Sequence, residues 1–235
     1  MNPNEKKIVL EKFKIWFKDT LIVSHVANTK KLVDLKEFKI NPFTHYYLSN
    51  FLDGNSDPKS LAKALVYPRV LGTSMTTIFG TLFQSFITKV LGGYGSTTKG
   101  IDIEFVDQID GRKKYCQLKS GPSAINRDDV TTIKDHFKSI KNLARTNGLD
   151  IQINDTVFCL LYGEKDEKNA FILELEKEYP VYIGKEFWYR FTGDENFYKD
   201  LIQVTNDLAK DVNMKSFLDD IVDKVSFKLI EKYNI

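Results

Sequence analysis

Hydrophobic residues recur at helical spacing over several long stretches of the chain. In residues 5 to 27, lysines interleave with an apolar stripe that includes Phe13 and Trp16, a pattern typical of an amphipathic helix. The same periodicity predicts further helices over residues 58–66 (ending before Pro68), 71–90 and 127–146, and a helical tail from about residue 196. Thr73 and Ser74 are the expected N-cap candidates of the 71–90 helix.

Period-two alternation and short apolar runs predict the strands. Residues 100–107 and 113–120 flank an Asp110-Gly111 turn, which indicates a β-hairpin. Residues 156–162 form a continuous apolar run, as expected of a strand buried on both faces. Two further strands are expected over residues 170–175 and 181–183. This order of elements predicts an α/β architecture, a mixed sheet flanked by helices, with peripheral helices at both ends.

Composition and charge narrow the function classes. Among 235 residues, 34 are basic and 32 acidic, a net charge of +2, so nucleic-acid contacts must come from local clusters of charge. Cys116 and Cys159 lie in apolar runs and are interpreted as buried thiols of a reducing compartment. Neither a signal peptide nor an apolar run of ~20 residues is apparent, so we expect a cytoplasmic protein. We expect a single domain over residues 1–235, with a core at about 60–195 and helical additions at 1–59 and 196–235.

The hairpin carries the candidate chemistry on one face. Alternation predicts that Asp102 and Glu104 of the first strand share a face with Gln117 and Lys119 of the second. Carboxylate and amide oxygens are suitable ligands for Mg²⁺, which acidifies a bound water and neutralises phosphate charge. A neighbouring lysine can orient or deprotonate that water and stabilise a pentavalent transition state. Phosphodiester hydrolysis needs this combination of groups.

The hairpin also resembles a known catalytic motif. Asp102, followed after fourteen residues by Gln117-Leu118-Lys119, is similar to the motif of the PD-(D/E)XK nuclease superfamily, with Gln at the (D/E) position. Four segments in order resemble one subgroup of type II restriction endonucleases: YPRVLGTSMTTIFG (67–80), GIDIEF (100–105), QLKSGP (117–122) and GKEFWYRFTGD (184–194). The resemblance covers roughly residues 60–195 and implies the restriction-endonuclease-like fold.

The resemblance implies a role for each motif residue. Asp102 matches the metal-binding aspartate, Gln117 stands where the family usually has an acidic residue, and Lys119 matches the catalytic lysine. Many members carry a further acidic residue on the preceding helix, where this chain has Gln84. The site therefore has fewer carboxylates than usual, and Glu104 is the candidate to supply the missing charge. A Gln can still offer a carbonyl oxygen as a metal ligand.

Each candidate also has a purely structural interpretation. Asp102 and Lys119 could form a cross-strand ion pair, which is worth roughly 0–1 kcal/mol, and Glu104 could be an ordinary exposed strand residue. The expected DNA contacts comprise hydroxyls at a helix N-terminus and polar residues that follow the catalytic strand: Thr73, Ser74, Ser123, Asn126 and Arg127. The Arg112-Lys113-Lys114 run is interpreted as a solvated hairpin tip. His25, His45 and His136 lack metal-ligand spacing and are interpreted as structural.

The sequence thus predicts a Mg²⁺-dependent type II restriction endonuclease that cuts a palindromic double-stranded DNA site as a homodimer. The resemblance points to GC-rich sites of the GG-N-CC kind. The expected dimer interface lies on the peripheral helices and includes Trp16, Phe217 and Ile221. Two alternatives stay open: another nuclease of the superfamily (repair, resolvase or phage defence), and a DNA-binding protein that keeps the fold but has lost catalysis.

Overall fold

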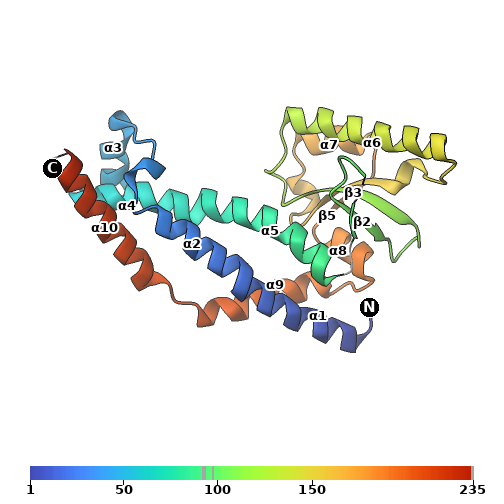
Figure 1. Cartoon of the computed structure of the whole chain (residues 1–235), viewed down its shortest axis with the longest axis horizontal. Coiled ribbons are helices and arrows are strands. Elements are labelled where there is room, and N and C mark those ends of the chain that lie inside the picture. Colours follow the sequence, from blue (N-terminus) through green and yellow to red (C-terminus); the bar gives the residue numbers. More distant parts are fainter. Residues whose placement is uncertain (92–93, 97, 234–235) are drawn as a thin grey trace. The chain divides into compact units, whose positions relative to one another are not determined.

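The computed structural model describes residues 1–91, 94–96 and 98–233 (Figure 1). The chain divides into two compact units: unit 1 comprises Met1–Ile15 and Gly80–Asn206, and unit 2 comprises Trp16–Phe79 and Asp207–Ile235. Unit 1 holds most of the expected nuclease core. Unit 1 also includes Met1–Ile15 at the start of the chain, whereas Trp16–Phe79, directly before Gly80, belong to unit 2. That the whole chain acts as one nuclease domain stays a prediction.

Unit 1 is built around a mixed sheet of five strands in the order β1-β2-β3-β4-β5. The strands are β1 (Tyr94–Gly95), β2 (Ile103–Val106), β3 (Lys113–Lys119), β4 (Thr156–Leu160) and β5 (Val181–Ile183). The first three strands pair antiparallel, and β3, β4 and β5 pair parallel. The predicted hairpin is confirmed, and so is the predicted buried strand, since every residue of β4 is buried. The mixed sheet flanked by helices is confirmed as the fold class.

Helices cover both faces of this sheet. α6 (Arg127–Asn147) and α7 (Ala170–Glu176) lie over one face and α8 (Lys185–Thr192) lies over the other (Figure 1). On the α6 side, Phe137 and Ile140 of the helix pack with Phe158 of β4 in one buried cluster. On the α8 side, Phe187 and Phe191 contact Phe105 of β2 at ring-centroid distances of 6.1 and 5.1 Å. The polar face of the hairpin is therefore covered by α6.

Capping residues explain where α6 and α7 begin. Asn126 accepts a hydrogen bond from the Asp129 amide, and the Asp129 carboxylate accepts one from the Asn126 amide, which together form a capping box. The prediction of a strand over 170–175 is wrong, because Asn169 caps the first turn of α7 in the same way. A short apolar run fits a buried helix face as well as a strand, and here the polar cap decides between them.

The segment from Pro58 to Val90 is helical throughout. α4 (Pro58–Pro68) continues through a π-helical stretch, η3 (Arg69–Ser74), into α5 (Met75–Val90). The predicted helix end before Pro68 and the predicted N-caps at Thr73 and Ser74 are therefore wrong. The extra residue in each π-helical turn explains how the helix passes a proline, which cannot donate to the preceding turn.

By length and composition, the described part of the chain has one helix that could cross a membrane, and it is Pro58–Val90. The 18-residue window has a mean hydropathy of 1.2, and 28% of it is buried. The expectation that no stretch of the chain is long and apolar enough to span a membrane is therefore corrected for Pro58–Val90. Helices in the cores of water-soluble proteins pass the same test, so one such helix is weak evidence for a membrane.

Unit 2 is helical. Its first helix is the continuation of α1 (Pro3–Trp16) through η1 (Phe17–Ile22) into α2 (Val23–Lys31), which confirms the predicted N-terminal helix. The unit also contains η2 (Leu35–Glu37), α3 (Pro42–Asp53), α4 and α10 (Lys215–Tyr233). α10 packs on α4 around a core that includes Leu61, Val66 and Val225. With α9 (Phe197–Asp211), α10 confirms the helical tail.

Candidate active site

The candidate site lies in unit 1, where strand β3 presents the motif residues toward helix α6. The β2–β3 ladder pairs Ile103 with Cys116, and just beyond that pair the Asp102 amide donates to the Cys116 carbonyl at 3.0 Å. The Asp102 carboxylate accepts a hydrogen bond from the Leu118 amide at 2.7 Å. These bonds place the carboxylate beside the backbone of the Gln117-Leu118-Lys119 motif, as the alternation of the hairpin predicts.

Burial dominates the electrostatics of Asp102. It raises the pKa of the carboxyl, although the Leu118 amide and the nearby Lys119 charge act in the opposite direction. Gln84 of α5 donates to the Asp102 carbonyl at 3.4 Å, so the residue that stands in place of a further acid does reach this site. A carboxylate that burial destabilises is one that a bound cation would stabilise most.

Lys119 is held by an acid that the sequence analysis did not single out for catalysis. Its ammonium donates to Asp129 of α6 at 2.7 Å. Burial opposes ionisation of Asp129, but the Lys119 ammonium and the Asn126 amide outweigh it and lower the pKa of this carboxyl. Asp129 is therefore a second carboxylate at the site, supplied by the first turn of α6. Lys119 therefore forms its ion pair with Asp129, and not with Asp102 as the structural alternative proposed.

Gln117 is buried between the end of the hairpin and α6. Its amide nitrogen donates to the Gly100 carbonyl and lies 3.3 Å from Nδ1 of His136. The ring of His136, which is interpreted as structural from the sequence, thus contacts a motif residue. His25 and His45 do serve as structural residues, with ring nitrogens 3.0 and 2.8 Å from the Val70 and Leu61 carbonyls.

Glu104 is buried and its carboxylate already has two partners. Ser96 donates to one oxygen, and the Lys113 ammonium lies 2.5 Å from the other. To act as a metal ligand, Glu104 would have to exchange these contacts. Across residues 1–91, 94–96 and 98–233, no three His, Cys, Asp or Glu side chains gather closely enough to form a metal centre of their own. A cation here would rely on Asp102, on amide oxygen and on water or phosphate.

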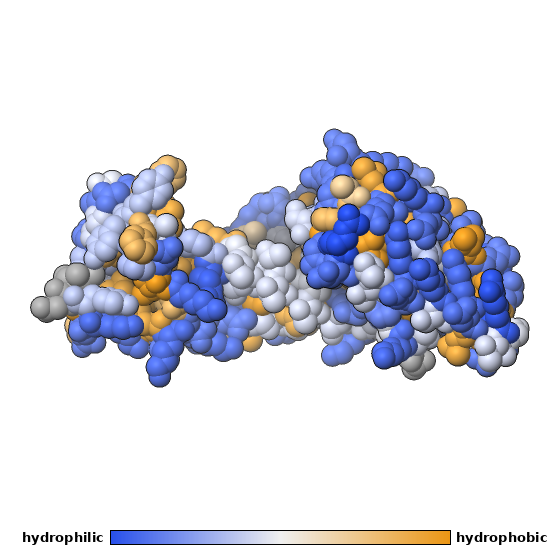
Figure 2. Space-filling model, turned by 90° about the horizontal axis from the view of Figure 1, so that it is seen from above, coloured by the Kyte–Doolittle hydropathy of each residue, from blue (hydrophilic) through white to orange (hydrophobic). Residues whose placement is uncertain are grey.

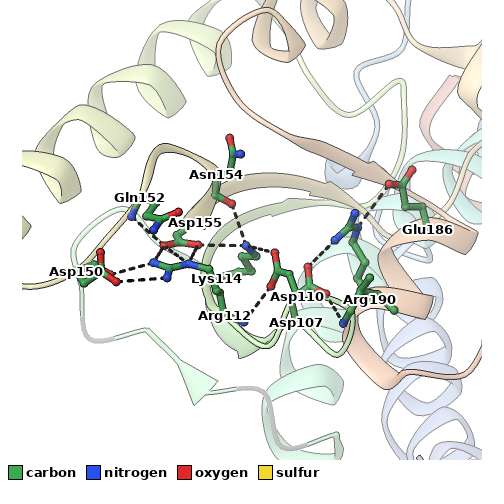
Figure 3. A network of polar contacts seen from close by, with 11 residues as sticks. Asp107, Asp110, Arg112, Lys114, Asp150, Gln152, Asn154, Asp155, Glu186 and Arg190 are labelled. Carbon is green, nitrogen blue, oxygen red and sulfur yellow. Dashed lines mark hydrogen bonds and ion pairs between the residues drawn. The ribbon is translucent and has the colours of Figure 1, made fainter.

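The basic run at the hairpin tip is not a solvated patch. Arg112 forms a two-nitrogen ion pair with Asp155, and the Lys114 ammonium, which is 1% exposed, contacts Asp155 and Asp110 at 3.1 and 2.7 Å (Figure 3). Burial opposes ionisation of Asp155, but Arg112 and Lys114 outweigh it and lower the pKa of this carboxyl to about 2. The network ties the hairpin to the segment before β4, so these cations stabilise the scaffold and are not free to bind phosphate.

The predicted DNA contacts are distributed over both units. Ser123 is exposed in the turn after the catalytic strand, Asn126 caps α6, and Arg127 forms a 2.6 Å ion pair with Glu174. Thr73 and Ser74 lie in unit 2 within η3, so the helix N-terminus that was expected to favour phosphate there does not exist. They line a cavity of about 250 Å³ together with Lys31, Arg69 and Glu37, and Arg69 donates to the Glu37 carbonyl at 2.7 Å.

Comparison with known proteins identifies the class of this site. The chain matches the family model of the type II restriction endonuclease EcoO109I over residues 28–213, which is most of its length. None of the curated proteins matches the chain. Members of this family act on double-stranded DNA and generally use divalent metal ions. The match separates the expected alternatives in favour of a restriction enzyme: the chain belongs to the family of the type II restriction endonuclease EcoO109I and is a site-specific deoxyribonuclease.

Proposed function

We propose that this enzyme hydrolyses phosphodiester bonds at a palindromic DNA site in a Mg²⁺-dependent reaction, with Asp102, Gln117 and Lys119 as its catalytic residues. The observation that carries the proposal is the Asp102 carboxylate, which burial destabilises at the point where it meets the backbone of β3. The donor set is chemically suited to Mg²⁺, since this hard cation takes oxygen ligands and keeps several waters. One carboxylate and one amide oxygen are therefore enough to anchor it.

Each residue has a distinct task in this proposal. Mg²⁺ at Asp102 and Gln117 would supply an acidified water and neutralise phosphate charge. The Lys119 ammonium, 2.7 Å from Asp129 in the structure, stabilises the negative charge on the oxygens of the pentavalent transition state and orients the attacking water. Asp129 holds that ammonium in place until DNA arrives. Glu104 is kept as a further candidate ligand that would first release Lys113.

DNA recognition is assigned to polar side chains near the site and to the cavity of unit 2 that Thr73 and Ser74 line. Ser123, Asn126 and Arg127 follow the catalytic strand directly, and Asn and Arg side chains can form bidentate contacts with base edges. Thr73 and Ser74, beside Lys31 and Arg69, supply hydroxyls and positive charge suited to phosphate contacts. We also assign the enzyme to the cytoplasm, a reducing compartment that suits its two buried free cysteines.

Digestion of supercoiled plasmid tests the metal requirement. With Mg²⁺ we expect discrete linear fragments, and with EDTA in place of the metal we expect intact supercoiled DNA. Adding NaCl to the EDTA sample until its ionic strength matches that of the Mg²⁺ sample checks that the effect follows the divalent cation and not the ionic strength. Equal cleavage in EDTA would contradict the proposal, because no described group other than a bound metal could acidify the attacking water to the same degree.

We further propose that the enzyme is a homodimer, with an interface that differs from the expected one. Ile221 is 2% exposed and Phe217 packs on the same cluster, so both are taken up by the core of unit 2 itself. The most exposed group of aromatic side chains in the described part of unit 2 lies on α3, where Phe43, Tyr47 and Phe51 are spaced four residues apart and are 91%, 64% and 78% exposed. Figure 2 shows hydrophobic side chains at the left of the view, where α3 lies in Figure 1. A palindromic site needs a second copy of the active site.

Charge on α3 should dissociate this dimer. We expect the parent protein to have twice the mass of one 27.1 kDa chain in light scattering at micromolar concentration, and the double variant Phe43→Glu/Phe51→Glu to have the mass of one chain. Both side chains are exposed in the single subunit, so the variant should keep its fold and its melting temperature. Leu143→Glu, on an exposed position of α6, is the matched control and should stay dimeric. An unchanged mass of the double variant would move the interface elsewhere.

A further inference from the structure

The amide of Gln117 is held in one orientation by two hydrogen-bond acceptors. The Gly100 carbonyl can only accept a hydrogen bond, and it contacts the Gln117 nitrogen. Nδ1 of His136, 3.3 Å from the same nitrogen, accepts when the ring proton is on Nε2. With that tautomer both N–H groups of the amide have partners, and the carbonyl oxygen is turned away from them. Rotating the amide by 180° would bring its oxygen against the Gly100 carbonyl.

The absence of a side chain at Gly100 leaves room for the His136 ring. Gly100 has a φ of +83°, in the left-handed region, and a Cβ added there would lie 2.3 Å from the His136 ring. Only glycine therefore leaves room for the ring at this point. Because Gly100 lies two residues before Asp102, the same short segment fixes the carboxylate and receives the amide of Gln117.

One face of helix α6 contacts both Gln117 and Lys119. Asp129, which holds Lys119, and His136, which contacts Gln117, are seven residues apart and so lie about two turns apart on the same side of the helix. Lys119 and Gln117 are separated by two residues on β3 and point to the same face of the sheet. The contacts of α6 therefore fix the two motif side chains of β3 together.

We propose that His136 is a positioning residue that fixes the Gln117 amide so that its oxygen, not its N–H₂ group, is presented to the metal. This inference rests on the proposed function, in which Gln117 is a ligand. A glutamine needs such a partner because only one of its two terminal atoms can coordinate a cation. A carboxylate at the same position would present an oxygen to the metal in either orientation, with its other oxygen against the Gly100 carbonyl in both, so His136 would not select between them. Removing partners that orient metal ligands typically costs about 10–100-fold in metal affinity or activity.

The test compares His136→Ala in two backgrounds. In the parent enzyme, we expect His136→Ala to raise the Mg²⁺ concentration for half-maximal cleavage by about tenfold or more, with DNA affinity unchanged. In the Gln117→Glu background, the same substitution should change this concentration less than twofold. The second readout is the rise in melting temperature on adding Mg²⁺, which reports binding without cleavage. It should shrink in His136→Ala and be kept in the double variant.

His25→Ala is the matched control, since His25 also contacts a main-chain carbonyl but lies in unit 2. It should leave the Mg²⁺ requirement unchanged. If His136→Ala raises the Mg²⁺ concentration for half-maximal cleavage equally in both backgrounds, His136 has a merely structural role. If this concentration changes in neither background, His136 is not part of the site. Either outcome overturns the inference. If instead Gln117→Glu itself leaves the Mg²⁺ profile of cleavage and of melting unaltered, Gln117 is not a ligand and the proposed function fails at that residue.

Discussion

Lys119→Ala should reduce DNA cleavage by at least ~100-fold and leave DNA binding within a few-fold of the parent. The ammonium is tied to Asp129 in the DNA-free protein, so its contribution is expected when charge develops on the phosphate and not in the bound ground state. Single-turnover cleavage measures the first quantity, and a gel-shift titration without metal measures the second.

Lys134→Ala provides the control for the loss of one positive charge from unit 1. Lys134 also lies in an ion-pair network, with Glu174 and Glu178, but it contacts none of the motif residues through its ammonium. We expect its cleavage rate to stay within about twofold of the parent. A Lys119→Ala variant that cleaves within tenfold of the parent would contradict the assignment of Lys119.

Asp102→Asn should abolish metal-dependent cleavage and at the same time raise the stability of the metal-free protein at neutral pH. Asparagine can still accept the Leu118 hydrogen bond but carries no charge for the cation. Burial raises the pKa of Asp102 above its unfolded value of 3.8. Below pH 3.8 the carboxyl is protonated in both states and its contribution to the free energy of unfolding is at its most favourable. As the pH rises through the folded pKa, the buried carboxyl ionises and that contribution is lost. At pH 7 the buried charge costs stability, and the substitution removes the cost.

Melting curves with and without Mg²⁺ separate the two effects. In EDTA, the melting temperature of Asp102→Asn should exceed that of the parent, by roughly 2–4 °C for each kcal/mol gained. The difference should disappear as the pH approaches 4, where the parent carboxyl is protonated. Mg²⁺ should raise the melting temperature of the parent only. A lower melting temperature of the variant at pH 7 would show that Asp102 stabilises the fold through its charge, as an ordinary ion-paired residue does.

Local signals in the sequence were sufficient for the hairpin and for the place of Asp102 beside β3. The Asp110-Gly111 turn and the alternation on either side fix the register that brings Asp102 to β3, and the Asn126 region marks the start of α6. The family assignment from four ordered segments is confirmed by the match over residues 28–213. These features depend on contacts that are close in sequence or on the motif itself.

The partners of the motif residues could not be predicted in the same way. Asp129 and His136 reach Lys119 and Gln117 only because α6 packs on the polar face of the sheet, and nothing in their sequence spacing reports that packing. His136 was interpreted as structural because it has no neighbouring metal ligands in sequence. Pro68 marked a helix end that a π-helical turn avoids, and the apolar run at 170–175 fitted two structures equally. The partners of the motif residues are thus set by tertiary packing, whereas the last two errors concern a local cap and a local helix type.

The most direct test of the central claim is to sequence the DNA ends produced by the purified enzyme on a plasmid of known sequence in Mg²⁺. We predict that every cut falls within one short sequence, that the two strands are cut at positions related by its two-fold symmetry, and that the site is of the GG-N-CC kind. Cuts of the two strands without a shared symmetric sequence, or ends scattered along the plasmid, would contradict the account of a palindrome-specific nuclease with one active site in each subunit.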